Sequence, residues 1–215
     1  MNENKKTPDK KAKSKKTVIV IFLLCILVLV CYFVLENVDV QGEKETSPTT
    51  MYSDTLYSYV FYPTDFDLDV TKDEWYMGLN REIYYKSGAV SYAISERDAE
   101  SSAVLGFFKK YFETVVAGDT ETYNAFFTDN YYKTNTPYVQ FAPQMIYNIE
   151  VEERTYESNP DGTTTYGFYV TYMIYKNDGT FRNDIDSDAS KTLYFKLIEY
   201  VDGSVKIDKI TNKGI

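Results

Sequence analysis

The chain has 215 residues, a formal net charge of −9 and no histidine, and its only two cysteines are Cys25 and Cys31. Without histidine it lacks the groups for Ser-His-Asp or Cys-His catalysis and for histidine-ligated zinc, and it contains no glycine-rich phosphate-binding motif. The excess of acidic side chains argues against nucleic acid as a partner.

An uncharged apolar run extends from Thr17 to Leu35. As a helix with 1.5 Å rise per residue it would be about 28 Å long, close to the hydrocarbon thickness of a bilayer. The residues that follow offer no small-x-small cleavage site, and neither cysteine follows the small residue that a lipoprotein signal requires. We therefore predict that residues 17–35 form an uncleaved transmembrane helix that anchors the chain in the lipid bilayer.

The charges on either side of this run predict its orientation. Residues 1–16 contain seven lysines and two acidic residues, whereas residues 36–215 contain 16 basic and 30 acidic residues. The positive-inside rule places the basic tail 1–16 in the cytoplasm and the acidic part outside the cell membrane, after a polar linker at 36–50. Because the exported part has no cysteine, we expect a single-pass protein of a bacterial envelope, of the Gram-positive type, rather than a disulfide-stapled secreted domain.

Residues 51–94 are predicted to be an N-terminal extension of the exported domain. The stretch from Leu56 to Tyr62 has the composition of a strand, which Pro63 ends. Residues 82–85 and 90–94 flank a Gly-containing turn and favour a hairpin. A helix from Trp75 to Tyr85 is the alternative, because apolar residues recur there every four positions.

The first clear helix is predicted at 97–117. Ser95 and Asp98 have the spacing of an N-terminal cap, and Gly118 supplies a C-terminal stop. Apolar residues recur between these ends at helical spacing: Val104, Phe107, Phe108, Tyr111, Phe112 and Val115.

A second, shorter helix is predicted at 120–131. Asp119 can cap it, and Tyr123, Phe126 and Phe127 fall on one face.

After the helices the apolar period changes from 3.6 to 2, which is typical of strands. Turn signals at 159–162, 177–179 and 202–203 separate the strands. The strands are predicted at 147–154, 164–175, 191–200 and 204–210. Helices followed by an antiparallel meander predict an α+β domain, 95–215, with helices packed on one face of a curved antiparallel sheet.

The segment Ala117-Gly118-Asp119-Thr120-Glu121-Thr122-Tyr123-Asn124-Ala125-Phe126-Phe127-Thr128-Asp129 resembles the helix–Gly-Asp–helix opening of the nuclear-transport-factor-2-like superfamily. The order of elements over 97–210 is similar to that superfamily, which implies strands that wrap into a cone. The resemblance does not explain residues 51–94. The predicted topology of cytoplasmic tail, single span and exported cone is similar to inner-membrane scaffold subunits of type IV secretion and conjugation machines.

Two runs of alternating aspartates, 65–69 and 184–188, invite a calcium interpretation. An EF-hand loop needs glycine at position six and glutamate at position twelve, and both runs lack these residues. Loose calcium binding stays open beside the simpler interpretation, a solvated acidic loop, which we favour. We assign no catalytic, cofactor-binding or metal-binding residue, and we expect no cofactor.

These observations favour a non-catalytic, membrane-anchored module that binds an envelope protein or joins a conjugation- or secretion-type assembly. The alternatives are a receptor for a small molecule or cell-wall fragment in the cone and an enzyme that uses only tyrosine and a carboxylate, a chemistry that enzymes of this cone-shaped fold can perform. A flat aromatic sheet face would favour assembly, and a deep pocket with an isolated polar group would favour the alternatives.

A candidate partner surface follows from the tendency of tyrosine to occur at interface hot spots. Its residues are Tyr169, Tyr172, Tyr175, Asp184, Asp186 and Asp188. The strand 164–175 is aromatic on both faces, so its sequence leaves open whether the face with Tyr169 or the face with Tyr172 is exposed.

Overall fold

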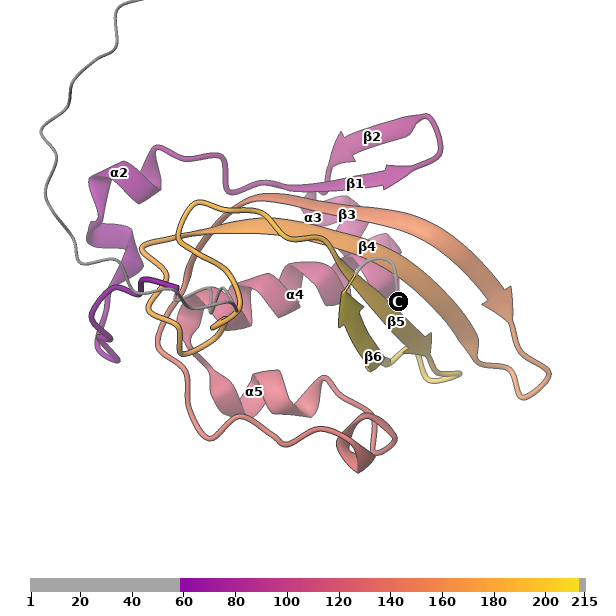
Figure 1. Ribbon diagram of the computed structural model, residues 1–215. Coiled ribbons are helices and arrows are strands. Elements are labelled where there is room, and N and C mark those ends of the chain that lie inside the picture. The colour runs from indigo at the N-terminus through magenta and orange to yellow at the C-terminus, as the bar shows by residue number, and fades with distance from the viewer. Residues whose placement is uncertain (1–58, 213–215) are drawn as a thin grey trace, which may run out of the picture. The chain divides into compact units, whose positions relative to one another are not determined.

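The computed structural model describes residues 59–212, which all belong to one compact unit (Figure 1). The segments 1–58 and 213–215 lie outside the described residues. The predicted tail, transmembrane helix and linker fall there and stay predictions. Within the described part, no helix has the length and apolar character that a membrane crossing needs.

The described unit combines short helices with one six-stranded sheet. Its strands are β1 (Ile83–Ser87), β2 (Val90–Ala93), β3 (Met145–Ser158), β4 (Thr164–Tyr175), β5 (Leu193–Glu199) and β6 (Val205–Asn212). Its helices are η1 (Val70–Lys72), α2 (Glu74–Met77), α3 (Glu96–Ser101), α4 (Ala103–Ala117), α5 (Thr120–Ala125) and η2 (Tyr131–Lys133). The α+β class is therefore confirmed.

The sheet is mixed, which corrects the prediction of an antiparallel one. Its strand order is β2-β1-β3-β4-β5-β6, and β1 runs parallel to β3 while all other neighbours are antiparallel. A parallel pair needs a long crossover, and the segment with α3, α4 and α5 supplies it. The extension thus adds the predicted hairpin to the edge of the same sheet (Figure 1).

The predicted caps form, but the first helix is interrupted. Ser95 and Asp98 make a reciprocal capping box, and Gly118 ends α4 in the left-handed conformation at φ 68°. Ser102 is extended (φ −133°) and caps α4 with its own side chain, so the helix predicted at 97–117 is two helices. The helix predicted at 120–131 stops at Ala125 and only a short 3₁₀ turn follows.

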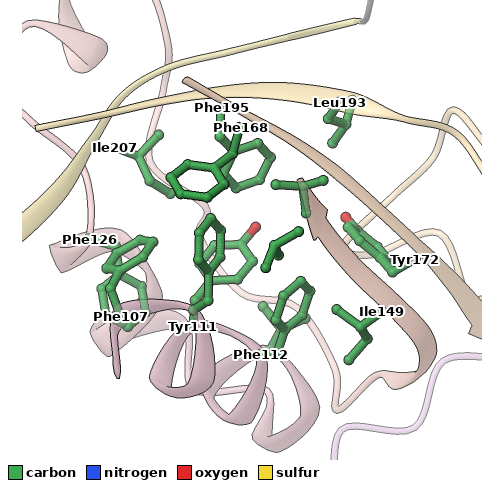
Figure 2. Packing of buried hydrophobic residues seen from close by; sticks show 14 of the residues in the cluster. Phe107, Tyr111, Phe112, Phe126, Ile149, Phe168, Tyr172, Leu193, Phe195 and Ile207 are labelled. Atoms are coloured by element: carbon green, nitrogen blue, oxygen red, sulfur yellow. The ribbon is translucent and has the colours of Figure 1, made fainter. Parts of the chain in front are cut away.

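The main core lies between α4 and one face of the sheet, called here the helix face (Figure 2). Phe108 is fully buried and meets Phe168 of β4 edge-on, with ring centroids 4.9 Å apart. Tyr111 packs in the same way on Phe195 of β5 at 5.7 Å. Aromatic burial and edge-on ring contacts of this kind hold the helix on the sheet.

A smaller cluster covers part of the opposite, outer face. Tyr76 of α2 is buried with Met145 and Tyr147 of β3, and its hydroxyl donates to the Ile146 carbonyl at 3.0 Å. A helix from Trp75 to Tyr85 is therefore wrong, because only the turn of α2 is helical and the chain then extends into β1. The strand predicted at 56–62 is not present in its described residues, 59–62.

Candidate functional site

A pocket of about 290 Å³ opens on the helix face between α4, α5, η2 and the end of the sheet. It is lined by aromatic and polar side chains from segments far apart in the chain: Tyr111, Tyr123, Tyr131, Tyr138, Tyr172, Phe181, Arg182, Asn183, Asp184, Leu193, Ile210, Thr211 and Asn212. We call it the inner pocket. It is the place where a buried cation, a carboxylate and several tyrosine hydroxyls meet.

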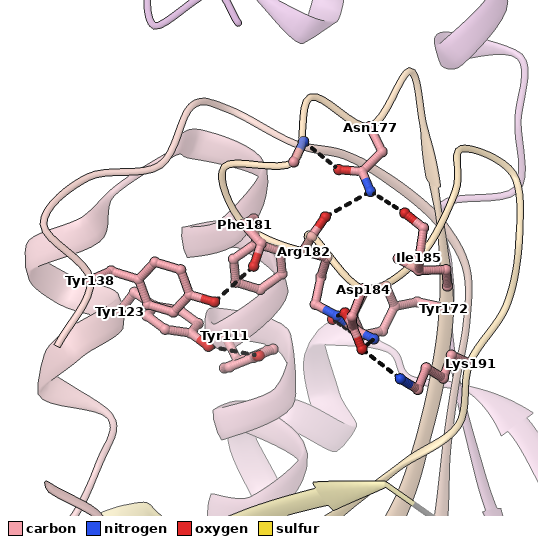
Figure 3. Close-up of polar contacts among 11 residues, drawn as sticks. Tyr111, Tyr123, Tyr138, Tyr172, Asn177, Phe181, Arg182, Asp184, Ile185 and Lys191 are labelled. Carbon is pink, nitrogen blue, oxygen red and sulfur yellow. Dashed lines mark hydrogen bonds and ion pairs between the residues drawn. The ribbon is translucent and has the colours of Figure 1, made fainter. Parts of the chain in front are cut away.

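The loop 176–192 between β4 and β5 brings the charged groups to this pocket, and Asn177 organises the loop (Figure 3). The Asn177 side chain is fully buried; its amide donates to the carbonyls of Arg182 (2.9 Å) and Ile185 (2.8 Å) and accepts from the Gly179 amide at 3.0 Å. Because a buried amide is costly unless it is hydrogen-bonded, these bonds fix the loop in one shape.

Arg182 is the central charged group, and its side chain is only 10% exposed. It makes a two-pronged ion pair with Asp184, from Nε at 2.6 Å and Nη2 at 3.1 Å, and Nη1 donates to the Tyr172 hydroxyl at 3.0 Å. Lys191 contacts the same carboxylate at 2.6 Å. These contacts use one N–H on each guanidinium nitrogen, three of its five donors.

The ion pairs keep Asp184 ionised. Burial alone would raise the pKa of its carboxyl, but the hydrogen bonds from Arg182 and Lys191 and their charges outweigh burial and lower the pKa to about 2. Two cations and one carboxylate leave this group with one net positive charge. In an otherwise acidic protein, the inner pocket is locally basic on one side.

The tyrosine hydroxyls add further donors. Tyr111 and Tyr123 are buried, and their oxygens are 3.5 Å apart, which is the one hydrogen bond that either hydroxyl makes within residues 59–212. Only one of the two protons can lie between them, so the other has no acceptor. Burial raises the pKa of both hydroxyls well above the usual value, which keeps them protonated. Tyr138, in contrast, already donates to the Phe181 carbonyl at 2.7 Å.

The structure divides the predicted partner surface between different places. Tyr172 is 3% exposed and Asp184 lies beside it, so both belong to the inner pocket. Tyr172 is therefore removed from the predicted exposed surface, because the face of β4 that carries it packs against α4. The Phe112 ring lies 5.7 Å from the Tyr172 ring.

The other members of the predicted surface lie outside the inner pocket. Tyr169 is half-buried on the outer face under the Arg154 guanidinium, 5.1 Å from its ring centroid, and Tyr175 packs against the cluster around Tyr76. Asp186 is exposed, and Asp188 accepts from the Tyr147 hydroxyl at 2.9 Å. These four residues do not form one site with Asp184.

The first aspartate run serves local structure, whereas Asp186 and Asp188 of the second accept hydrogen bonds from distant residues, the Val60 amide and the Tyr147 hydroxyl. Asp69 caps η1 by accepting from Thr71, and Asp65 accepts from the Asp67 amide within the same turn. In residues 59–212, no group of three or more Asp or Glu side chains is arranged to hold a metal ion. Asn177 and Arg182 are not among the predicted site residues. The sequence marks Asn177 only as part of a turn, and nothing local marks a single arginine in an acidic loop as buried.

No protein-family model, curated protein or solved structure matches this chain. The resemblance to the nuclear-transport-factor-2-like superfamily therefore stays a prediction from residues 117–129 and the order of elements, and function has to be argued from the pocket itself.

Proposed function

We propose that this chain is a membrane-anchored binding module and that its inner pocket binds a small, acceptor-rich ligand outside the cell membrane. The supporting observation is that the Arg182 guanidinium and several tyrosine hydroxyls, all hydrogen-bond donors, line the same pocket. Three of the five guanidinium N–H groups of Arg182 bond to Asp184 and Tyr172, and the Tyr111 and Tyr123 hydroxyls share a single hydrogen bond, so these groups have donor capacity to offer a ligand. The Tyr172 hydroxyl also accepts from Arg182 and keeps its own proton to donate. Carboxylate, carbonyl or hydroxyl oxygens of a ligand would satisfy these donors.

The state of the carboxylate favours binding over catalysis. Asp184 is the one carboxylate that lines the inner pocket among the described residues. A general base works best with a pKa near the operating pH, and the pKa of Asp184 is lowered to about 2 by its partners. A carboxylate held in this way positions Arg182 rather than accepting a proton from a substrate.

The shape and charge of the pocket narrow the ligand class. Several tyrosine rings form flat walls, and flat aromatic walls suit the apolar face of a sugar ring. The net positive charge of Arg182, Lys191 and Asp184 suits a carboxylate. We therefore propose a cell-wall fragment that combines a sugar ring with a carboxylate, which agrees with the extracellular position that the sequence predicts.

The test compares two sugars that differ by one acid group, N-acetylmuramic acid and N-acetylglucosamine, by calorimetric titration of the full chain in detergent. We expect the acid to bind more tightly. The double variant Tyr111→Phe/Tyr123→Phe removes the two hydroxyls and keeps the rings, so affinity should fall about tenfold while stability changes little.

Tyr84→Phe is the control, because Tyr84 lies on β1 and does not line the inner pocket. Equal affinity for the two sugars would refute the carboxylate preference. No measurable binding of either sugar, or an unchanged affinity in the double variant, would refute the wall-fragment proposal.

Assembly with an envelope protein, such as a conjugation- or secretion-type complex, is the second candidate, and exposed apolar side chains near α2 favour it. Trp75 is 70% exposed, and Val60 and Phe66 are 77% and 49% exposed. Large exposed apolar side chains mark interaction sites where they gather in one patch. A photo-crosslinker at Trp75 should trap an envelope protein in living cells, with Asp129 as the exposed control position. Equal or absent crosslinking at the two positions would contradict assembly through this surface.

A further inference from the structure

A second pocket, of about 390 Å³, lies on the helix face beside α3 and the start of α4. We call it the tyrosine groove. Four of its lining residues are tyrosines from four strands, β1 to β4: Tyr85, Tyr92, Tyr156 and Tyr166. The rest of the lining comes from the two helices and the neighbouring strand positions: Asp98, Ser101, Ser102, Val104, Leu105, Glu153 and Phe168. It shares no lining residue with the inner pocket.

A bulge in β3 places Glu153 and Tyr156 on the same face. Regular alternation would send positions 153 and 156 to opposite faces of the sheet. The register against β4 shifts by one residue between Glu153 and Thr155, so Glu153 pairs with Phe168 and Tyr156 pairs with Tyr166. A carboxylate and an accessible aromatic ring therefore line the same groove.

The tyrosine rings are held in two pairs. Tyr85 and Tyr92 have centroids 5.5 Å apart, and Tyr156 and Tyr166 meet edge-on at 5.3 Å. The Tyr85 hydroxyl donates to Glu153 at 2.8 Å and the Tyr166 hydroxyl donates to Glu199 at 2.7 Å, which orients both rings. Tyr156 is 61% exposed and Tyr92 is 37% exposed, so the groove is open to ligands.

The charge of the groove is negative. Glu153 and Asp98 line it, and none of the lining residues is a lysine or arginine. A third carboxylate, Glu199, accepts the hydrogen bond from the Tyr166 hydroxyl. Arg97 is exposed on the neighbouring α3, outside the lining. The electron-rich faces of several tyrosines beside a carboxylate form the environment that attracts an organic cation.

We infer that the tyrosine groove binds the alkylammonium group of a small molecule. The rings supply cation–π contacts and Glu153 supplies a charge partner. The inference does not depend on the function proposed for the inner pocket, because the two pockets are lined by different residues and prefer ligands of opposite charge.

The experiment compares choline with its uncharged isostere 3,3-dimethylbutan-1-ol. Both are titrated into the full chain, solubilised in a detergent that has no ammonium headgroup, and binding is followed by saturation-transfer NMR and calorimetry. Choline should bind at millimolar or lower concentration, and the isostere should bind about tenfold more weakly because it lacks the charge.

Two variants locate the site. Tyr156→Leu removes an exposed ring and should weaken choline binding about threefold to tenfold without unfolding the protein. Glu153→Gln should weaken choline binding and leave the binding of the isostere unchanged. The matched controls are Tyr84→Leu and Glu157→Gln, neither of which lines the groove.

Equal binding of choline and its isostere would overturn the inference, because the cation would then contribute nothing. Failure of choline to bind, or unchanged affinity in Tyr156→Leu, would also overturn it. Choline binding that is lost in the double variant Tyr111→Phe/Tyr123→Phe, but not in Tyr156→Leu, would assign the cation to the inner pocket instead.

Discussion

Replacing Asp184 by asparagine tests how the ion pairs of the inner pocket stabilise the fold. The variant keeps the shape of the side chain but removes the charge that Arg182 and Lys191 share. Arg182 would then keep the Tyr172 hydroxyl and ring, 3.0 Å and 5.7 Å away, as its remaining contacts. A cation in a buried position that loses its charge partner destabilises the folded state.

The magnitude follows from the pKa of Asp184. Burial raises the pKa, the hydrogen bonds and charges of Arg182 and Lys191 lower it more, and the result is about 2, compared with about 3.9 for an unfolded aspartate. This difference of about 1.9 pKa units corresponds to about 2.6 kcal/mol of the free energy of unfolding. The side chain is 40% exposed, so solvent screens the interaction, and we expect about 1 kcal/mol at neutral pH.

The pH dependence has a definite sign. Since folding lowers the pKa, the stabilisation is present above pH 4 and is lost as the pH falls from about 4 to about 2. Urea denaturation of the full chain in detergent, followed by circular dichroism between pH 7 and pH 2, measures this. The difference in the free energy of unfolding between wild type and Asp184→Asn should disappear on acidification. Asp129→Asn, at an exposed position, is the control. A difference that grows toward low pH would refute the reasoning, and so would a difference no larger than the one between wild type and Asp129→Asn.

Further predictions concern the core and the topology. Phe108→Ala should lower the free energy of unfolding by about 3–5 kcal/mol, because the ring is fully buried against Phe168, whereas Trp75→Ala at an exposed position should change it by less than about 0.5 kcal/mol. Urea denaturation measures both, and equal effects would mean that α4 does not pack as described. Ser158→Cys places a cysteine at an exposed position at the end of β3, and the native cysteines both lie in the predicted span. An impermeant maleimide should label it on intact cells, and labelling only after lysis would contradict the predicted orientation.

The sequence predicted those elements whose signals are local. The bounds of β4 agree with the prediction from turn residues and alternation, and the caps at Ser95, Gly118 and Asp119 form. The hairpin of β1 and β2 was one of two alternatives, and it forms because the glycine of its turn, Gly88, takes a positive φ of 57°. Signals of this kind depend on backbone conformation and on neighbours a few residues away.

The interruption between α3 and α4 shows the limit of local signals. The apolar period continues across it, so the sequence predicts one helix, but the Ser102 side chain offers the Leu105 amide a competing bond.

The arrangement of the pockets was decided by the tertiary structure. β4 has aromatic residues on both faces, so its alternation specifies a strand but does not select the buried face. The packing of α4 makes the selection and buries Tyr172. The parallel pairing of β1 with β3 and the burial of Arg182 likewise arise from residues distant in the chain. Periodicity determined the class of fold, because it depends on the local order of apolar residues, and composition determined the chemistries that the chain lacks, because those depend on residue types alone. Both pockets depend on which side chains meet across the sheet, and only the folded chain brings those side chains together.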